Sequence, residues 1–89
     1  MDQSSYEALQ NGELVEEMIA SPGWSLFCER FEQIKDGLLA RLVAGVEDFT
    51  TYRGICHALE TLGDIERIPG EYREAANQVR ENLSDDEHG

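Results

Sequence analysis

Four side chains of the sequence have the chemistry to ligate a metal or to act as a nucleophile and its base. They are Cys28, Cys56, His57 and His88. Their spacing matches no zinc motif of the C-x-x-C or H-x-x-x-H kind. Cys56 and His57 are adjacent, but successive residues point about 100° apart on a helix, so they do not form a Cys-His dyad. The sequence therefore predicts no metal site, no cofactor and no catalytic residue, which is to say a non-enzymatic protein.

A polar stripe offers a different kind of chemistry, the recognition of a partner. Arg53, His57 and Glu60 recur at i, i+4 and i+7, so they share one side of a helix. The alternative interpretation is a solvated stripe with one weak intrahelical pair. Trp24 and Tyr52 add large aromatic rings to a chain with a small core. We predict a partner-binding site made of Trp24, Tyr52, Arg53, His57 and Glu60.

The elements that must position these residues come from the stretch 21–63. Its apolar residues recur at steps of three and four, the period of an amphipathic helix, in two arms. Ser21 and Pro22 form a favourable helix start, Gly45 a helix end, and Asp48 the cap of the next helix. The sequence therefore predicts an antiparallel helical hairpin with a tight turn at 43–47.

Two glycines interrupt the arms of this hairpin. Gly37 and Gly54 fall opposite each other if the turn centres between Gly45 and Val46. A glycine inside a helix costs about 1 kcal/mol relative to alanine. We therefore predict a close helix crossing at Gly37 and Gly54, where a side chain would not fit.

Short helices are predicted on both sides of the hairpin. The spacing of Ser4 and Glu7 is that of a capping box, which predicts a first helix starting there. Gly63 is expected to end the second arm, and a fourth helix to begin near Pro69. The fold class is thus all-α, with a single helical domain over 1–83 and an acidic flexible tail over 84–89.

Composition excludes several function classes. The 89 residues carry 19 acidic and 7 basic side chains, a net charge of −12. Such a chain lacks the basic face that nucleic acid requires, and no apolar run reaches the roughly 20 residues of a membrane span. The first twenty residues contain no Lys or Arg, unlike a secretory or transit signal. We expect a protein of the cytosol. The charge fits a basic protein partner, mimicry of nucleic acid, or solvated helix faces that keep the protein soluble.

Several short motifs resemble those of a group of small acidic helical proteins of tailed bacteriophages. The motifs are Ser21-Pro22-Gly23-Trp24 at a helix start and Tyr52-Arg53-Gly54 before a short apolar helix end, with further matches at Phe27, Phe31, Leu38, Ala58 and Leu59. The resemblance covers roughly 14–72. Such proteins tend to be encoded among head, portal and packaging genes, and the group has no catalytic residues to carry over. The resemblance implies a phage gene product located in the host cytoplasm or in the virion.

Two functions follow as expectations. The first is an interaction protein that acts as a virion assembly factor or minor virion component. The second is a counter-defence protein, either an acidic decoy for a host protein or an oligomer that sequesters a nucleotide with Arg53 from neighbouring subunits. The chain has more large aromatic side chains than a small core can bury. We therefore predict a homo-oligomer or an obligate protein partner.

Overall fold

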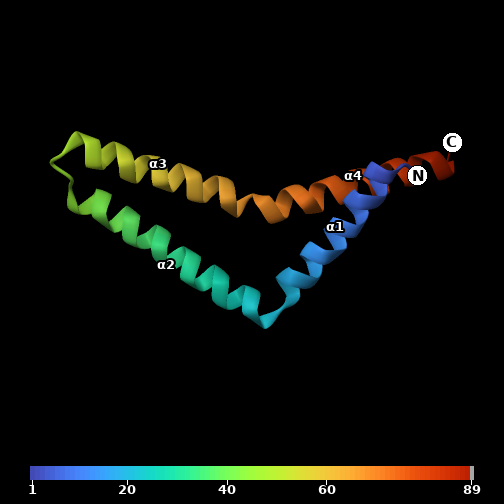
Figure 1. Ribbon diagram of the computed structural model, residues 1–89, viewed down its shortest axis with the longest axis horizontal. Helices are drawn as coiled ribbons and strands as arrows, with labels where there is room; N and C mark the ends of the chain where they lie inside the picture. The colour runs from blue at the N-terminus through green and yellow to red at the C-terminus, as the bar shows by residue number, and fades with distance from the viewer. Residues whose placement is uncertain (89) are drawn as a thin grey trace. The chain divides into compact units, whose positions relative to one another are not determined.

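The computed structural model describes residues 1–88, with side chains through Ser84, and these residues form four helices. The helices are α1 (Gln3–Ala20), α2 (Pro22–Ala44), α3 (Phe49–Glu66) and α4 (Ile68–His88), and the described residues contain no strand (Figure 1). The predicted all-α fold is confirmed.

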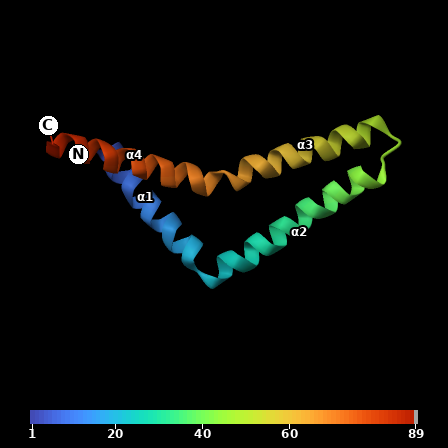
Figure 2. The same ribbon diagram turned by 180° about the vertical axis from the view of Figure 1, so that it is seen from behind.

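The helices pair into two units. The terminal unit consists of α1 and α4, and the central unit, Pro22–Glu66, consists of α2 and α3. Figure 2 shows the same two pairs from behind. A single domain over 1–83 and a flexible tail over 84–89 stay predictions; α4 continues to His88, and Gly89 lies outside the described residues.

The terminal unit is held by a close approach of α1 to α4. Gly12 is buried, and a β-carbon added to it would overlap the β-carbon of Ala76 and lie 3.6 Å from the carbonyl oxygen of Tyr72. On the same pair of helices, Arg73 Nε donates a hydrogen bond to Glu16 Oε1 over 2.9 Å. Gly12 therefore allows the two backbones to meet, and α1 continues through it without a break.

The first helix begins earlier than the capping box predicts. Asp2 is the N-cap, and its carboxylate accepts a 2.7 Å hydrogen bond from the backbone N–H of Ser5. This hydrogen bond holds the pKa of Asp2 below its usual value. The predicted start at Ser4 is wrong because an acidic cap lies two residues upstream.

The central unit is the predicted hairpin. Its first helix begins at Pro22, and Gly45 follows the last residue of α2 with a φ of 98°, a conformation that favours glycine. Asp48 caps α3, because its Oδ2 accepts hydrogen bonds from the N–H of Thr51 (3.0 Å) and from its hydroxyl (2.7 Å). The predicted helix end at Gly45 and the cap at Asp48 are confirmed, and the connection between the helices is residues 45–48 where 43–47 was predicted. The second arm, however, does not end at Gly63: α3 continues to Glu66, and a turn at Arg67 separates it from α4.

The facing sides of α2 and α3 form what we call the seam. Its residues are spaced alternately three and four positions apart on both helices, as in a coiled coil. On α2 it consists of Trp24, Cys28, Phe31, Lys35, Leu38 and Leu42, and on α3 of Tyr52, Ile55, Leu59, Leu62 and Glu66. The α2 members are all half-buried, and Ile55 is buried. Both cysteines of the chain are free thiols.

The predicted close crossing at Gly37 and Gly54 is wrong. A β-carbon built on either glycine would meet no atom within 4 Å outside its own helix. The physical reason is their position: on a period of 3.6 residues both glycines point away from the seam, whose large side chains lie between the helices. The close approach of this chain is at Gly12, in the other unit.

Candidate functional site

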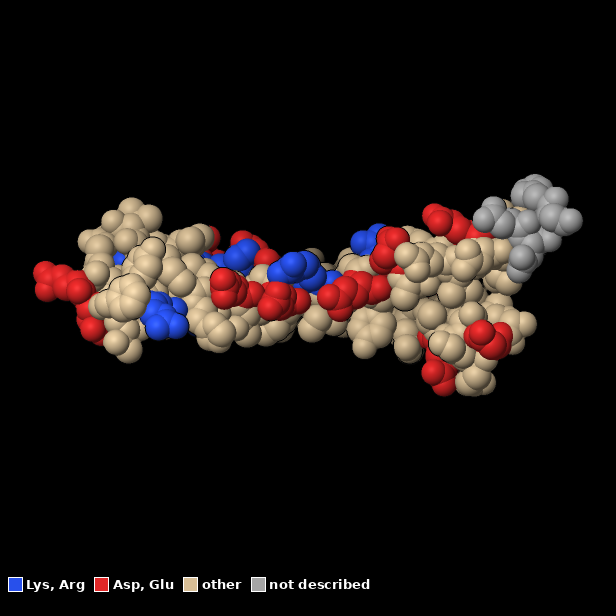
Figure 3. Space-filling model, turned by 90° about the horizontal axis from the view of Figure 1, so that it is seen from above, with Lys and Arg blue, Asp and Glu red and all other residues tan. Residues whose placement is uncertain are grey.

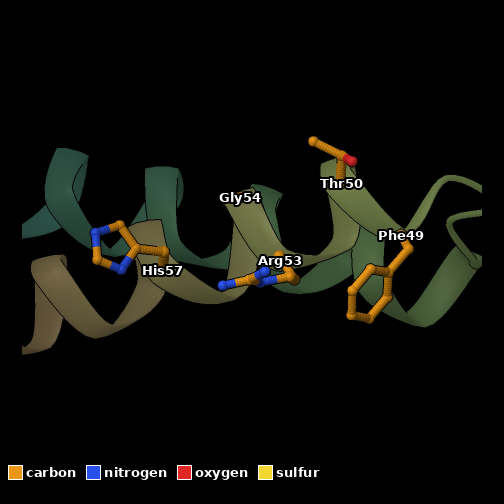
Figure 4. Close-up of a pocket in the computed structure, with 5 residues that line it drawn as sticks. All are labelled: Phe49, Thr50, Arg53, Gly54 and His57. Atoms are coloured by element: carbon orange, nitrogen blue, oxygen red, sulfur yellow. The ribbon is translucent and has the colours of Figure 1, made fainter.

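The exposed side of α3 carries a shallow hollow beside its first turns. Phe49, Thr50, Arg53, Gly54 and His57 line it, with a volume of about 420 Å³ (Figure 4). The Arg53 guanidinium carbon lies 6.0 Å from the centre of the Phe49 ring, within the range of a cation–π interaction. Figure 4 shows Arg53 between Phe49 and His57 along the helix. The hollow thus combines a fixed cation, an aromatic face and an imidazole.

The residues of the predicted polar stripe are neighbours on α3. His57 Nδ1 lies 3.9 Å from Glu60 Oε2, and both side chains are largely exposed. Arg53 lies one turn before His57 in the same hollow. Because water screens exposed charges, the His57–Glu60 contact adds little to stability and leaves both groups accessible. Partner binding by Arg53, His57 and Glu60 stays a prediction.

The two predicted aromatic residues lie apart from each other. Tyr52 belongs to α3, next to Arg53, and is partly exposed. Trp24 lies in the first turn of α2, at the end of the hairpin far from its turn, and its ring stacks on Phe27 with centroids 5.4 Å apart. The structure therefore brings Tyr52, Arg53, His57 and Glu60 onto one helix and leaves Trp24 at the opposite end of the hairpin.

The ion pair that joins α2 to α3 was not anticipated from the sequence. Lys35 Nζ donates to both carboxylate oxygens of Glu66 at 2.9 Å, and Glu32 Oε1 lies 3.6 Å away. The hydrogen bond to Glu66 raises the pKa of Lys35, and the same bond lowers the pKa of Glu66. Both residues occupy seam positions, and the Lys35 side chain is only 24% exposed. A polar pair in an apolar seam fixes the register of the two helices. In the sequence, both residues fall on the alternating steps of three and four that define the seam on their helices.

Apolar side chains are exposed over much of the chain. Among the described residues, the buried apolar side chains are Ile55, 4% exposed, and Ala76, fully covered. Large apolar residues that remain exposed include Tyr6, Leu14, Leu26, Phe27, Ile34, Leu39, Val43, Phe49, Tyr52, Ile65, Ile68 and Tyr72. Figure 3 shows wide uncharged areas between the acidic and basic side chains on one face. Isolated exposed apolar residues are ordinary, but in the described part of the chain many large apolar side chains are exposed and few are buried.

No family model, no curated protein and no solved structure matches this chain. The resemblance to tailed-phage proteins therefore stays a prediction.

Other kinds of site find no support in the described part of the chain. Within it, no group of three or more His, Cys, Asp or Glu side chains could hold a metal ion. No helix among the described residues is both long and apolar enough to cross a membrane.

Proposed function

We propose that this chain is a non-enzymatic helical interaction protein whose central unit binds a protein partner. The observation that carries the proposal is the contrast between two buried apolar side chains, Ile55 and Ala76, and the many large apolar side chains left exposed. Covering apolar surface is the main favourable term in protein association, at about 25 cal/mol per Å². A hairpin of this kind gains stability when a partner covers it.

The contact surface that the geometry favours is the exposed side of α3. It offers the guanidinium of Arg53 and the His57–Glu60 pair within three turns of one helix, and the partly exposed ring of Tyr52 lies beside it at the edge of the seam. Tyrosine and arginine are enriched among the residues that carry binding energy in interfaces. Arg53 is the residue whose removal we expect to weaken partner binding most.

The biological setting that we propose is the assembly of a tailed phage, where the protein is an assembly factor or a minor virion component. Support comes from the S-P-G-W and Y-R-G motifs at Trp24 and Arg53. Both motifs lie in the central unit, the first at the start of α2 and the second in α3. In this proposal the protein acts in the host cytoplasm, with or without retention in the particle.

The test is capture of tagged protein from infected cells, followed by mass spectrometry of what it binds. Wild-type protein is expected to retain head, portal or packaging proteins, and Arg53→Ala to lose them while far-UV circular dichroism stays unchanged. Arg80→Ala is the matched control, since Arg80 is an exposed arginine on α4 whose Nη1 bonds only locally, to Asn77 Oδ1 at 2.9 Å. Equal capture by the Arg53 and Arg80 variants would remove Arg53 from the contact surface.

A second candidate function rests on the hollow itself. Arg53 above the exposed ring of Phe49 pairs a cation with a stacking surface, which suits a phosphate attached to an aromatic base. This favours the nucleotide-sequestering form of a counter-defence protein. Isothermal titration with AMP and ATP tests it: binding that disappears in Arg53→Ala supports this candidate, and absence of heat with either nucleotide counts against it.

A further inference from the structure

Helix α1 has apolar side chains on two opposite sides. Its inner side packs on α4 around the buried Gly12. On a period of 3.6 residues, Tyr6, Leu14 and Met18 lie on the side away from Gly12, and all three are exposed, Leu14 to 57%. One apolar stripe is enough to pack a helix on a single neighbour, so the contact with α4 does not require the second. We call this second side the outer face of α1; its apolar and charged members are Tyr6, Glu7, Leu14, Glu17 and Met18.

The acidic residues of α1 stand where they cost the helix stability. Glu17 lies in the last turn, where the helix dipole disfavours a negative charge, and that turn contains no basic residue. Glu13 precedes Glu16 by three residues and Glu17 by four, the spacings at which like charges on a helix repel each other. Arg73 compensates Glu16 through a 2.9 Å hydrogen bond, but no described basic side chain pairs with Glu13 or Glu17. A cation from outside the described chain would relieve this repulsion.

Charge identifies the chemistry that complements the outer face. Glu7 and Glu17 lie on it beside Leu14, and α1 contains no basic residue. The terminal unit as a whole contains eleven acidic and three basic residues, so it carries −8 of the net charge of −12. Such a field attracts cations and repels anions, whereas the apolar stripe requires an apolar surface opposite it. A basic amphipathic helix, with Lys or Arg on both sides of an apolar stripe, meets both requirements.

We propose that the outer face of α1 docks a basic amphipathic helix of another protein. Leu14 and Met18 contact the apolar stripe of that helix, and Glu7 and Glu17 pair with its Lys or Arg side chains. Binding also removes the uncompensated repulsion between Glu13 and Glu17. This surface belongs to the terminal unit and is separate from the contact surface proposed on α3.

Isothermal titration of the full chain with a helical peptide of Leu and Lys, its leucines spaced at steps of three and four, tests the apolar part of the proposal. Leu14→Ser is expected to raise the Kd of the peptide about 10-fold, because one leucine no longer becomes buried on binding. Leu26→Ser is the matched control, since Leu26 is an exposed leucine of α2. Its Kd is expected to stay within about two-fold of the wild type, and far-UV circular dichroism should be the same for all three proteins.

A second pair of variants tests the charged part. The double variant Glu7→Gln with Glu17→Gln is expected to raise the Kd of the same peptide about 5-fold at low salt. Glu74→Gln with Glu81→Gln removes the same charge from the same unit, but these exposed residues lie on the side of α4 away from α1. Their Kd is expected to stay within about two-fold of the wild type. A peptide with Glu in place of every Lys is expected not to bind.

The stability of the free chain separates a binding role of Glu17 from a structural one. Glu17→Gln removes a charge that the helix dipole and Glu13 both disfavour, so it is expected to raise the urea midpoint while it weakens binding of the Lys peptide. A lower midpoint in this variant would show that Glu17 supports the fold, which contradicts the proposal.

Three further results would overturn the proposal: no heat with the Lys peptide, equal losses of affinity in the paired leucine or paired glutamate variants, or equal binding of the Lys and Glu peptides. A wild-type dimer in sedimentation equilibrium that Leu14→Ser dissociates would assign the outer face to a second copy and overturn it as well. None of these results affects the proposed partner of α3, since the capture experiment with Arg53→Ala reports on that partner separately.

Discussion

Replacing Gly12 by alanine is the sharpest test of how the terminal unit is built. The added β-carbon would overlap Ala76, whose own β-carbon is fixed to the backbone of α4 and cannot rotate away. Carbon atoms pack best about 3.5–4.0 Å apart, so α1 and α4 must separate to admit the methyl group. Overpacking of this kind costs about 1–3 kcal/mol. Alanine regains about 1 kcal/mol through its better helix propensity, so the expected net loss is up to about 2 kcal/mol.

Urea unfolding followed by circular dichroism at 222 nm measures this change as a lower midpoint at unchanged slope. Gly70→Ala is the control within the same unit, because a β-carbon at Gly70 meets nothing within 4 Å. That variant is expected to keep or raise the midpoint. The double variant Gly12→Ala with Ala76→Gly moves the methyl group to the other side of the crossing. Its loss of stability should therefore be smaller than the sum of the losses in the two single variants. A midpoint for Gly12→Ala above that of the wild type, as expected for Gly70→Ala, would refute the close approach of α1 and α4.

Two further predictions concern carboxylates of the central unit. Lys35 lowers the pKa of Glu66 below its ordinary value of 4.5, so this pair stabilises the fold above that value and its contribution is lost as the pH falls through the lowered pKa. The loss of helicity on acidification should therefore be less steep in Glu66→Gln than in the wild type. An equally steep loss in both proteins would contradict the role of the pair. Thr51 lowers the pKa of Asp48, first through its hydroxyl and then through its N–H, so Asp48→Ala should lower the melting temperature at pH 7 and much less at pH 2. Equal loss at both pH values would show that the cap does not act through its charge.

Local signals in the sequence were enough to predict the hairpin. Pro22, Gly45 and Asp48 act on backbone groups within four residues of themselves, so their types reveal the helix ends that they make. The same holds for the stripe of Arg53, His57 and Glu60, which depends only on the period of one helix.

Contacts between distant segments were not predictable in this way. Gly12 and Gly37 look alike in the sequence, since each interrupts a helical pattern, yet Gly12 meets another helix and Gly37 does not. Periodicity shows which side of a helix is apolar but not which helix covers it. For the same reason the pairing of Lys35 with Glu66, 31 residues apart, needed the structure.

The pairing of α1 with α4 has a consequence for the order in which the chain folds during synthesis. Helix α1 leaves the ribosome first, but its partner helix ends at His88. At about 5–20 residues per second, α1 waits roughly 3–14 s for α4, while α2 and α3 become complete in between. During this interval α1, which has four acidic residues and no basic residue, lacks the helix on which it packs. The entropic cost of closing a loop grows only slowly with its length. A longer or shorter segment between α1 and α4 would therefore change the stability of this helix pair only slightly.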